Sequence, residues 1–183
     1  MRLILFGGPG SGKGTQATFL VDHFQIPHIS TGDILRAERA NNSELGQQAQ
    51  TYMDSGQLVP DQLVVDMVEK RLTQADAQSG WLLDGFPRNA NQATVLEEML
   101  QRTEQGYDYL LFLEVPPEIL SQRLLGRQRQ DDDPKVIQDR LRVYAEETLP
   151  MILSYQDHPK FVQIDGMEPI GTVTTAIKTA ITS

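Results

Sequence analysis

The chain of 183 residues contains no cysteine at all. Disulfide bonds and zinc sites built from cysteine are therefore excluded, and the composition suits a reducing compartment. Long apolar runs are missing too: the opening MRLILFGG stretch is too short for a signal peptide or a membrane span. We therefore predict a cytoplasmic protein that does not associate with membranes.

Basic residues are few. The chain has 16 Lys and Arg against 25 Asp and Glu, a formal net charge of −9. This balance argues against a broad nucleic-acid-binding surface, although local arginines can still bind an anion as small as a nucleotide. Repeats, linkers and low-complexity segments are also lacking, so the length indicates one domain with a real core.

Short apolar stretches alternate with segments of helical spacing along the chain. They predict five strands, at residues 3–6, 26–29, 81–84, 109–115 and 161–165. Asp133 and Pro134 predict the start of a long helix, which Pro150 is expected to kink. This alternation predicts an α/β fold with an open parallel sheet, whose ligands bind at the carboxyl ends of the strands.

The stretch FGGPGSGKGTQ, residues 6–16, lies between the first predicted strand and a helix. Gly7, Gly12 and Lys13 fit the phosphate-loop pattern Gly, four residues, Gly-Lys, but Gly14 stands where Ser or Thr usually binds magnesium. Thr15 follows one place late. The strand–loop–helix setting favours a phosphate site over a glycine-rich turn with a solvated lysine, because backbone N–H groups and the helix N-terminus then surround the phosphates.

The WLLD stretch is an apolar strand that ends in Asp84. An aspartate in this place often anchors magnesium beside a phosphate loop, although at a strand end it can also be an ordinary turn residue. With a phosphate loop in the same sheet, we favour the metal role. The metal could then be held by acids, without a serine next to Lys13.

Several arginines lie in segments predicted to meet at the carboxyl edge of the sheet. They are Arg36, Arg88, Arg123, Arg127, Arg129 and Arg140. Arginine binds phosphate as a planar, bidentate fork. The alternative is a solvated surface in which arginines pair with nearby aspartates. We adopt that alternative for Arg142, and for Arg129 and Arg140 we expect acids to orient side chains that also bind phosphate.

Taken together, these motifs make the chain resemble the adenylate kinase family along nearly its whole length. The matching stretches are GGPGSGKGTQ (7–16), STGDILR (30–36), DSGQLVPD (54–61), LLDGFPRNANQA (82–93) and the arginines from Arg123 to Arg140. The resemblance implies a P-loop NTPase-like sheet with a small helical insertion that binds the nucleoside monophosphate. It also implies reversible transfer of the γ-phosphoryl group of Mg-ATP to AMP, giving two ADP.

The same resemblance implies the residues of the ATP side. Arg123 lies against the adenine, Arg127 reaches the phosphates, and the backbone of Glu168 recognises the adenine. Magnesium is held through water by Asp33 and Asp84, with Thr15 as a possible further contact, and a zinc-binding lid is excluded. The loop that wraps the phosphates consists of Gly10, Ser11, Gly12, Lys13, Gly14 and Thr15.

On the acceptor side, the resemblance implies an AMP pocket in which Thr31 and Gln92 select the base. Uridylate and cytidylate kinases tend to have alanine at the Thr31 position. Without the resemblance, Thr31 would be interpreted as a helix cap and Gln92 as an exposed helix residue. The implied pocket comprises Thr31, Arg36, Gln57, Leu58, Val59, Gly85, Phe86, Pro87, Arg88, Gln92, Arg129 and Arg140.

The acceptor phosphate is already ionised near neutral pH, so no general base is required, and the three histidines are interpreted as structural or surface residues. Catalysis then rests on alignment and charge neutralisation. The residues expected to provide it are Lys13, Arg88, Arg123, Arg127, Arg129 and Arg140.

We expect one domain over residues 1–183, and a monomer. Its core comprises 1–29, 60–126 and 133–183, with an AMP-binding flap at 30–59 and a very short lid loop at 127–132. Two alternatives stay open: a kinase of UMP or CMP, and a non-enzymatic P-loop nucleotide sensor.

Overall fold

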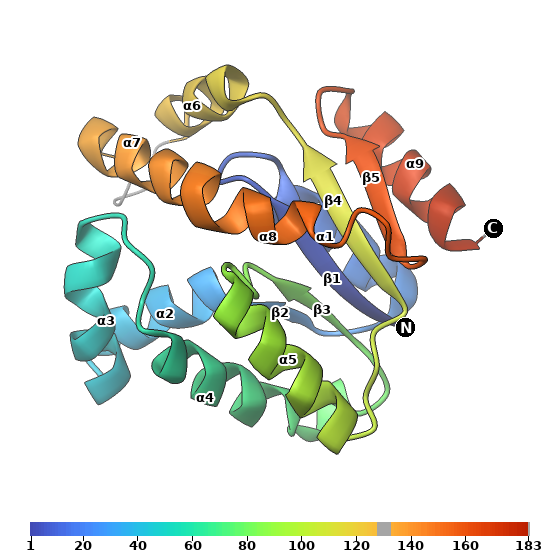
Figure 1. Ribbon diagram of the computed structural model, residues 1–183, viewed down its shortest axis with the longest axis horizontal. Coiled ribbons are helices and arrows are strands. Elements are labelled where there is room, and N and C mark those ends of the chain that lie inside the picture. The colour runs from blue at the N-terminus through green and yellow to red at the C-terminus, as the bar shows by residue number, and fades with distance from the viewer. Residues whose placement is uncertain (128–132, 183) are drawn as a thin grey trace.

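The computed structural model describes residues 1–127 and 133–182. Within them, a five-stranded parallel sheet has the strand order β2-β3-β1-β4-β5 (Figure 1). The strands are β1 (Arg2–Gly7), β2 (His28–Ser30), β3 (Trp81–Asp84), β4 (Tyr109–Glu114) and β5 (Phe161–Asp165). The predicted fold class is confirmed. The second strand begins two residues later than predicted, at His28, because Pro27 has no N–H to donate to a ladder.

Helices connect the strands. The bounds of the α-helices are α1 (Lys13–Phe24), α2 (Thr31–Ala40), α3 (Glu44–Asp54), α4 (Asp61–Leu72), α5 (Ala90–Arg102), α6 (Pro117–Leu125), α7 (Pro134–Val143), α8 (Leu149–Leu153) and α9 (Ile170–Thr182). A short 3₁₀ turn at Ala75–Ala77 precedes β3.

Successive side chains of β1 point to opposite faces of the sheet, so the core is divided into two layers. Leu3 and Leu5 pack in a cluster with residues of α1 and α9. Ile4 and Phe6 point to the opposite face, in a cluster with residues of α4, α5 and α8. Each such side chain contributes about 1.5–3 kcal/mol of transfer free energy when it is buried. The two clusters hold the strand ends, and hence the loops that follow them, in fixed places.

The sequence predicts a simple kink at Pro150 in the helical segment that follows Asp133. The structure has a π-helical turn before Pro150 instead. The turn Tyr144–Thr148 between α7 and α8 is π-helical, and the N–H of Leu149 bonds to the carbonyl of Tyr144. A proline offers no N–H for the usual ladder, so a wider turn before it is a way to keep the helical path. Figure 1 shows α7, this turn and α8 as one continuous coil.

The segment between β2 and α4 holds α2 and α3, which pack against each other. Gly56, just after α3, has a φ of +70°. A methyl group at this position would lie 2.8 Å from the Val136 carbonyl oxygen and 3.3 Å from Arg140 Cγ. The bare glycine therefore lets this loop touch α7.

No helix among the described residues is long and apolar enough to cross a membrane.

Candidate active site

A cavity of about 620 Å³ opens beside the carboxyl ends of β1, β2 and β3. Its lining comes from the loop after β1, from α1 and α2, from the loop after α3, and from the arginines of α6 and α7. These segments are far apart in the sequence. The position agrees with the expectation for an open parallel sheet, in which ligands bind at this edge.

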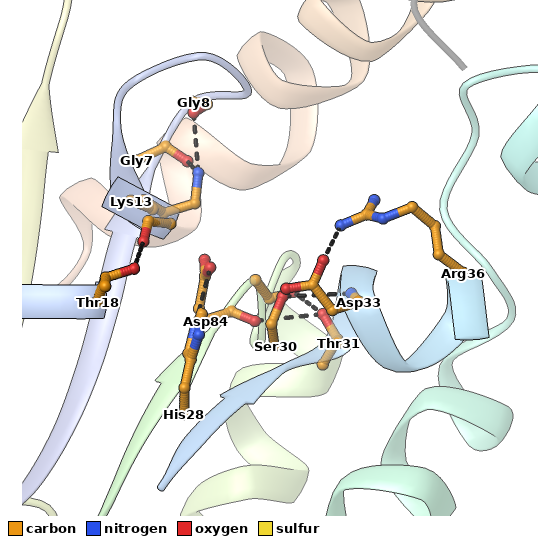
Figure 2. A network of polar contacts seen from close by, with 12 residues as sticks. Gly7, Gly8, Lys13, Thr18, His28, Ser30, Thr31, Asp33, Arg36 and Asp84 are labelled. Carbon is orange, nitrogen blue, oxygen red and sulfur yellow. Dashed lines mark hydrogen bonds and ion pairs between the residues drawn. The ribbon is translucent and has the colours of Figure 1, made fainter. Parts of the chain in front are cut away.

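The loop after β1 leads into α1, and no side chain accepts a capping hydrogen bond from the N–H groups at the start of this helix. Gly12, the N-cap of α1, has a φ of +98°, and no side chain caps this helix end. Left-handed backbone of this kind favours glycine. The Lys13 Nζ donates to the carbonyls of Gly7 and Gly8 at 2.8 and 2.9 Å (Figure 2). A free helix N-terminus with a lysine beside it is an anion site.

Four polar side chains gather across the cavity from Lys13. The carboxylate of Asp84 is buried and lies 3.4 Å from His28 Nε2, while the carboxylate of Asp33 pairs with Arg36 at 2.5 Å (Figure 2). Burial raises the pKa of the Asp33 carboxyl, but the bond and charge of Arg36, with smaller help from Ser30 and His28, hold it below 3.8. The Asp33 carboxylate is therefore negative at neutral pH.

These carboxylates fit a hard divalent cation. Asp33, Asp84 and Thr15 all line the same cavity and all offer oxygen. Oxygen donors suit Mg²⁺, which is usually bound through one or two carboxylates, substrate phosphates and several retained waters. No cluster of three or more metal-binding side chains occurs among the residues that the structure describes. This donor set fits magnesium held with substrate phosphate rather than a closed protein cage.

Arg88 is held in place from three directions. Its Nε donates to the Gly85 carbonyl at 2.6 Å and its N–H to Gln92 Oε1 at 2.8 Å, while its carbonyl accepts from Thr148 Oγ1 at 2.7 Å. Burial lowers the pKa of the guanidinium; Asp84 opposes this shift, and the charges of Arg140 and Arg36 add to it. Arginine nevertheless stays protonated in proteins. Three cations thus face one region, which suits a polyanion.

Thr31 is buried at the start of α2. The helix cap is Ser30, whose hydroxyl accepts from the N–H of Asp33, and not Thr31. The Thr31 hydroxyl instead donates to the Gly85 carbonyl at 2.9 Å. This bond ties α2 to the turn after β3.

The turn after β5 is linked to α6 by Arg123, whose Nη2 donates to the Gly166 carbonyl at 3.0 Å. Asp165 stabilises the turn through a 2.8 Å bond from the N–H of Met167. Glu168, in the same turn, is exposed and does not line the cavity. Of Arg123 and Glu168, only Arg123 therefore lines the cavity.

Most of the predicted site residues come together around the one cavity. Those that line it are Gly10, Gly12, Lys13, Gly14, Thr15, Thr31, Asp33, Arg36, Gln57, Leu58, Val59, Asp84, Gly85, Arg88, Gln92, Arg123, Arg127 and Arg140. Ser11 is buried and does not line it. Phe86 and Pro87 line a smaller adjoining cavity of about 100 Å³. Arg129 and most of the predicted lid loop lie outside the described residues.

Some residues near the site are not evident from the sequence. Thr18 lines the cavity one turn after Gly14, and its hydroxyl donates to that carbonyl at 3.1 Å. Helical spacing from the phosphate loop could have indicated it. His28, interpreted from the sequence as an ordinary structural or surface residue, lines the cavity beside Asp84. Its place in the predicted strand 26–29, next to the carboxyl end, was the available signal.

Arg142 is interpreted correctly from the sequence as part of a solvated surface. It pairs with Asp139 at 3.3 Å and with Glu146 at 3.2 Å, and half of its side chain is exposed. It does not line the cavity. Arg140, two residues earlier, does.

Comparison with known proteins agrees with this geometry. The family model described as adenylate kinase matches residues 5–160. The chain belongs to the adenylate kinase family. An adenylate kinase of Thermosynechococcus vestitus is 63% identical, over 99% of this chain and 97% of the relative. An adenylate kinase of a Cyanothece species is 52% identical over 97% and 93%, and adenylate kinase 1 of a Nostoc species is 51% identical over 100% and 99%. Family membership identifies the chain as a nucleotide-binding phosphotransferase.

Proposed function

We propose that the chain catalyses the reversible transfer of the γ-phosphoryl group of Mg-ATP to AMP, which gives two ADP. One observation carries this proposal. A single cavity joins an unblocked phosphate loop to a separate set formed by Arg36, Arg88 and Gln92. A site that only sensed a nucleotide would need the loop but not the second set. Two polyanions in one cavity suit transfer between them.

On the donor side, the backbone of residues 10–15 binds the ATP phosphates, and Lys13 turns from its own loop carbonyls toward the outer phosphates. Arg127 adds positive charge to them. Arg123 holds the turn after β5 through Gly166 and lies against the adenine. The backbone at Glu168 recognises the adenine.

On the acceptor side, Arg36, Arg88 and Arg140 bind the AMP phosphate, and Thr31, Gln92 and the backbone of residues 57–59 surround the base. An AMP phosphate oxygen is the nucleophile, and it is ionised near neutral pH. The protein therefore aligns the two nucleotides, neutralises charge at the transferring group and excludes water. Arg129, which lies outside the described residues, is proposed to share this task.

Asp33 and Asp84 would hold the magnesium of Mg-ATP through bound water, with Thr15 as a further candidate contact. The ion supplies neutralisation of the phosphate charge when it is bound. A zinc-binding lid has no place in the proposal, because the chain has no cysteine.

We also propose that residues 30–59 act as a flap over AMP and residues 127–132 as a very short lid. The close approach of Gly56 to α7 supports a flap that meets the helix carrying Arg140. A cytoplasmic monomer that binds neither nucleic acid nor membranes completes the proposal. Light scattering after size-exclusion chromatography tests whether the protein is a monomer, for which a mass near 20.5 kDa is expected.

A coupled assay with Mg-ATP and each of AMP, UMP, CMP and GMP tests the function. We expect ADP to form quickly with AMP and slowly with the other three. Faster turnover of UMP or CMP than of AMP would make the chain a pyrimidine nucleotide kinase. ATP binding without turnover of any monophosphate would make it a nucleotide sensor.

A further inference from the structure

Asp61 does not line the cavity, yet its carboxylate bonds to a side chain that does. We propose that Asp61 is a positioning residue: it fixes the amide of Gln92 and thereby makes the acceptor site select adenine over a 6-oxopurine. This inference rests on the proposed function, since it needs AMP as the acceptor. It concerns how the site chooses its base and not whether the site transfers phosphate.

The Asp61 carboxylate accepts three amide hydrogen bonds. Its Oδ1 accepts from Gln92 Nε2 at 2.8 Å and from Asn89 Nδ2 at 3.0 Å, and its Oδ2 accepts from Asn91 Nδ2 at 2.7 Å. No cation forms an ion pair with Asp61 among the described residues. The carboxylate at the start of α4 is thus used to hold the first turn of α5.

These bonds determine which way the Gln92 amide points. An ionised carboxylate only accepts hydrogen bonds, so the amide nitrogen must face Asp61. The N–H of Arg88 only donates, so the amide oxygen must face Arg88, and the distance of 2.8 Å agrees. Gln92 is also 1% exposed, so water cannot readily replace either partner. One orientation satisfies both contacts, and the flipped amide satisfies neither.

The same carboxylate fixes Gln92 by a second route. Asn89 is the N-cap of α5, and its Oδ1 accepts from the backbone N–H of Gln92 at 2.8 Å. Because Asn89 Nδ2 faces Asp61, the Asn89 amide is oriented as well. Asp61 therefore controls both the side chain and the backbone at Gln92.

An amide fixed in this way has one N–H and one oxygen lone pair left for a base. Adenine offers the complement, a donor at N6 beside the acceptor N1. A 6-oxopurine has an acceptor at O6 and a donor at N1, so both contacts become mismatched. A site built to hydrogen-bond one pattern rejects the other strongly when its own groups cannot rearrange. Release of the Gln92 amide should therefore weaken AMP binding and relax this choice.

A simpler role for Asp61 would be stabilisation of α4, because a negative charge near a helix N-terminus is favourable. The two roles separate by substitution. Asp61→Asn removes the charge but keeps an oxygen that can accept from Gln92 and Asn89. Asp61→Ala removes the acceptor as well. A helix role predicts similar effects of both changes, whereas a positioning role predicts an effect of Asp61→Ala on the base.

The experiment measures dissociation constants for AMP and IMP by calorimetry, and KM for AMP and for ATP, in the wild type and these variants. For Asp61→Ala we expect AMP to bind about tenfold more weakly, the AMP-to-IMP preference to fall about tenfold, and KM for ATP to change less than about twofold. For Asp61→Asn we expect values within about threefold of the wild type. Asp66→Ala is the matched control, because Asp66 is an exposed acid on α4 that accepts a bond from Gln62.

Base preference in Asp61→Ala equal to that in Asp66→Ala would overturn the inference, as would equal losses in Asp61→Ala and Asp61→Asn. If Asp61→Ala does not fold, Asp61→Glu serves instead: it keeps the charge but displaces the oxygens, so weaker AMP binding and a lower preference are still expected. Wild-type chain that fails to turn over AMP would contradict the proposed function, on which this inference rests. Turnover in the wild type with an unchanged preference in the variants separates the two.

Discussion

The donor and acceptor halves of the cavity are built in different ways. On the donor side, Lys13 bonds to carbonyls five and six residues away, inside its own loop. On the acceptor side, Arg88 and Gln92 are held by Thr148 and Asp61, which lie 60 and 31 residues away in the sequence. A local loop supplies the proposed phosphate site almost by itself. Selection of an acceptor needs several helices to be placed first.

The largest expected effect tests the acceptor half. Arg88→Ala removes a partly buried cation from the group proposed to face the acceptor phosphate, and arginines on a transferring phosphoryl group are worth about 10³–10⁵ in rate. We expect turnover to fall by that factor, about 4–7 kcal/mol, with thermal unfolding close to that of the wild type. Steady-state kinetics and a melting curve measure the two quantities.

Arg142→Ala is the control for Arg88→Ala, because Arg142 pairs only on the surface among the contacts described, and we expect its activity to be unchanged. Arg140→Ala should resemble Arg88→Ala. Activity of either site variant within about tenfold of the wild type would contradict the assigned role.

The next prediction concerns the donor half. Lys13→Met keeps the length of the side chain but removes the charge proposed to face the outer phosphates, and loss of one preorganised electrostatic group costs about 10²–10³ in kcat. We expect this loss with KM for AMP nearly unchanged, because Lys13 belongs to the other half. A rise in KM for AMP as large as the loss in kcat would show that the two halves are not separate. Initial rates measured over a grid of ATP and AMP concentrations give both constants.

The difference between the halves also explains what could be predicted from the sequence. The strands, the phosphate loop and the place of Asp84 at the end of a strand follow from apolar runs and spacing, which are local signals. The start of β2 at His28 is missed because the apolar pattern hides the effect of Pro27 on pairing. Thr31 becomes informative only when the structure shows that Ser30 is the cap.

Other parts of the acceptor half cannot be read from a pattern. Thr148 reaches Arg88 through the π-helical turn before Pro150, and nothing in the spacing predicts a π turn there. Asp61 is evident as the start of a helix but not as the acceptor of bonds from α5. Both depend on how α4, α5 and α8 pack on one face of the sheet, which the sequence leaves open.

A smaller effect is expected at Thr148. Thr148→Val keeps the shape but deletes the hydroxyl that donates to the Arg88 carbonyl at 2.7 Å. Net loss of one such hydrogen bond is worth about 0.5–1.5 kcal/mol, so kcat/KM for AMP should fall about two- to tenfold. Thr148→Ser keeps the hydroxyl and should retain most of the activity. If Thr148→Val and Thr148→Ser have the same kcat/KM for AMP, the hydrogen bond from Thr148 does not position Arg88.

The smallest effect is the pH dependence of stability at Asp61. Burial raises the pKa of this carboxyl, but bonds from Asn89, Asn91 and Gln92 outweigh it and hold the pKa below 3.8. A carboxyl with a lowered pKa stabilises the fold above its unfolded value, and this contribution is lost as the pH falls through the folded value.

We therefore expect the unfolding free energies of the wild type and Asp61→Asn to differ at pH 6 and to converge as the pH falls below 3.8. Urea unfolding at a series of pH values measures this difference. Asp33 and Asp76 also have a lowered pKa, but both are present in the two proteins, so their contributions cancel in the comparison. A difference that stays constant down to the acid limit of folding would mean that the three amides do not depend on the charge of Asp61. These bonds would then need the oxygens of Asp61 as acceptors and not their charge.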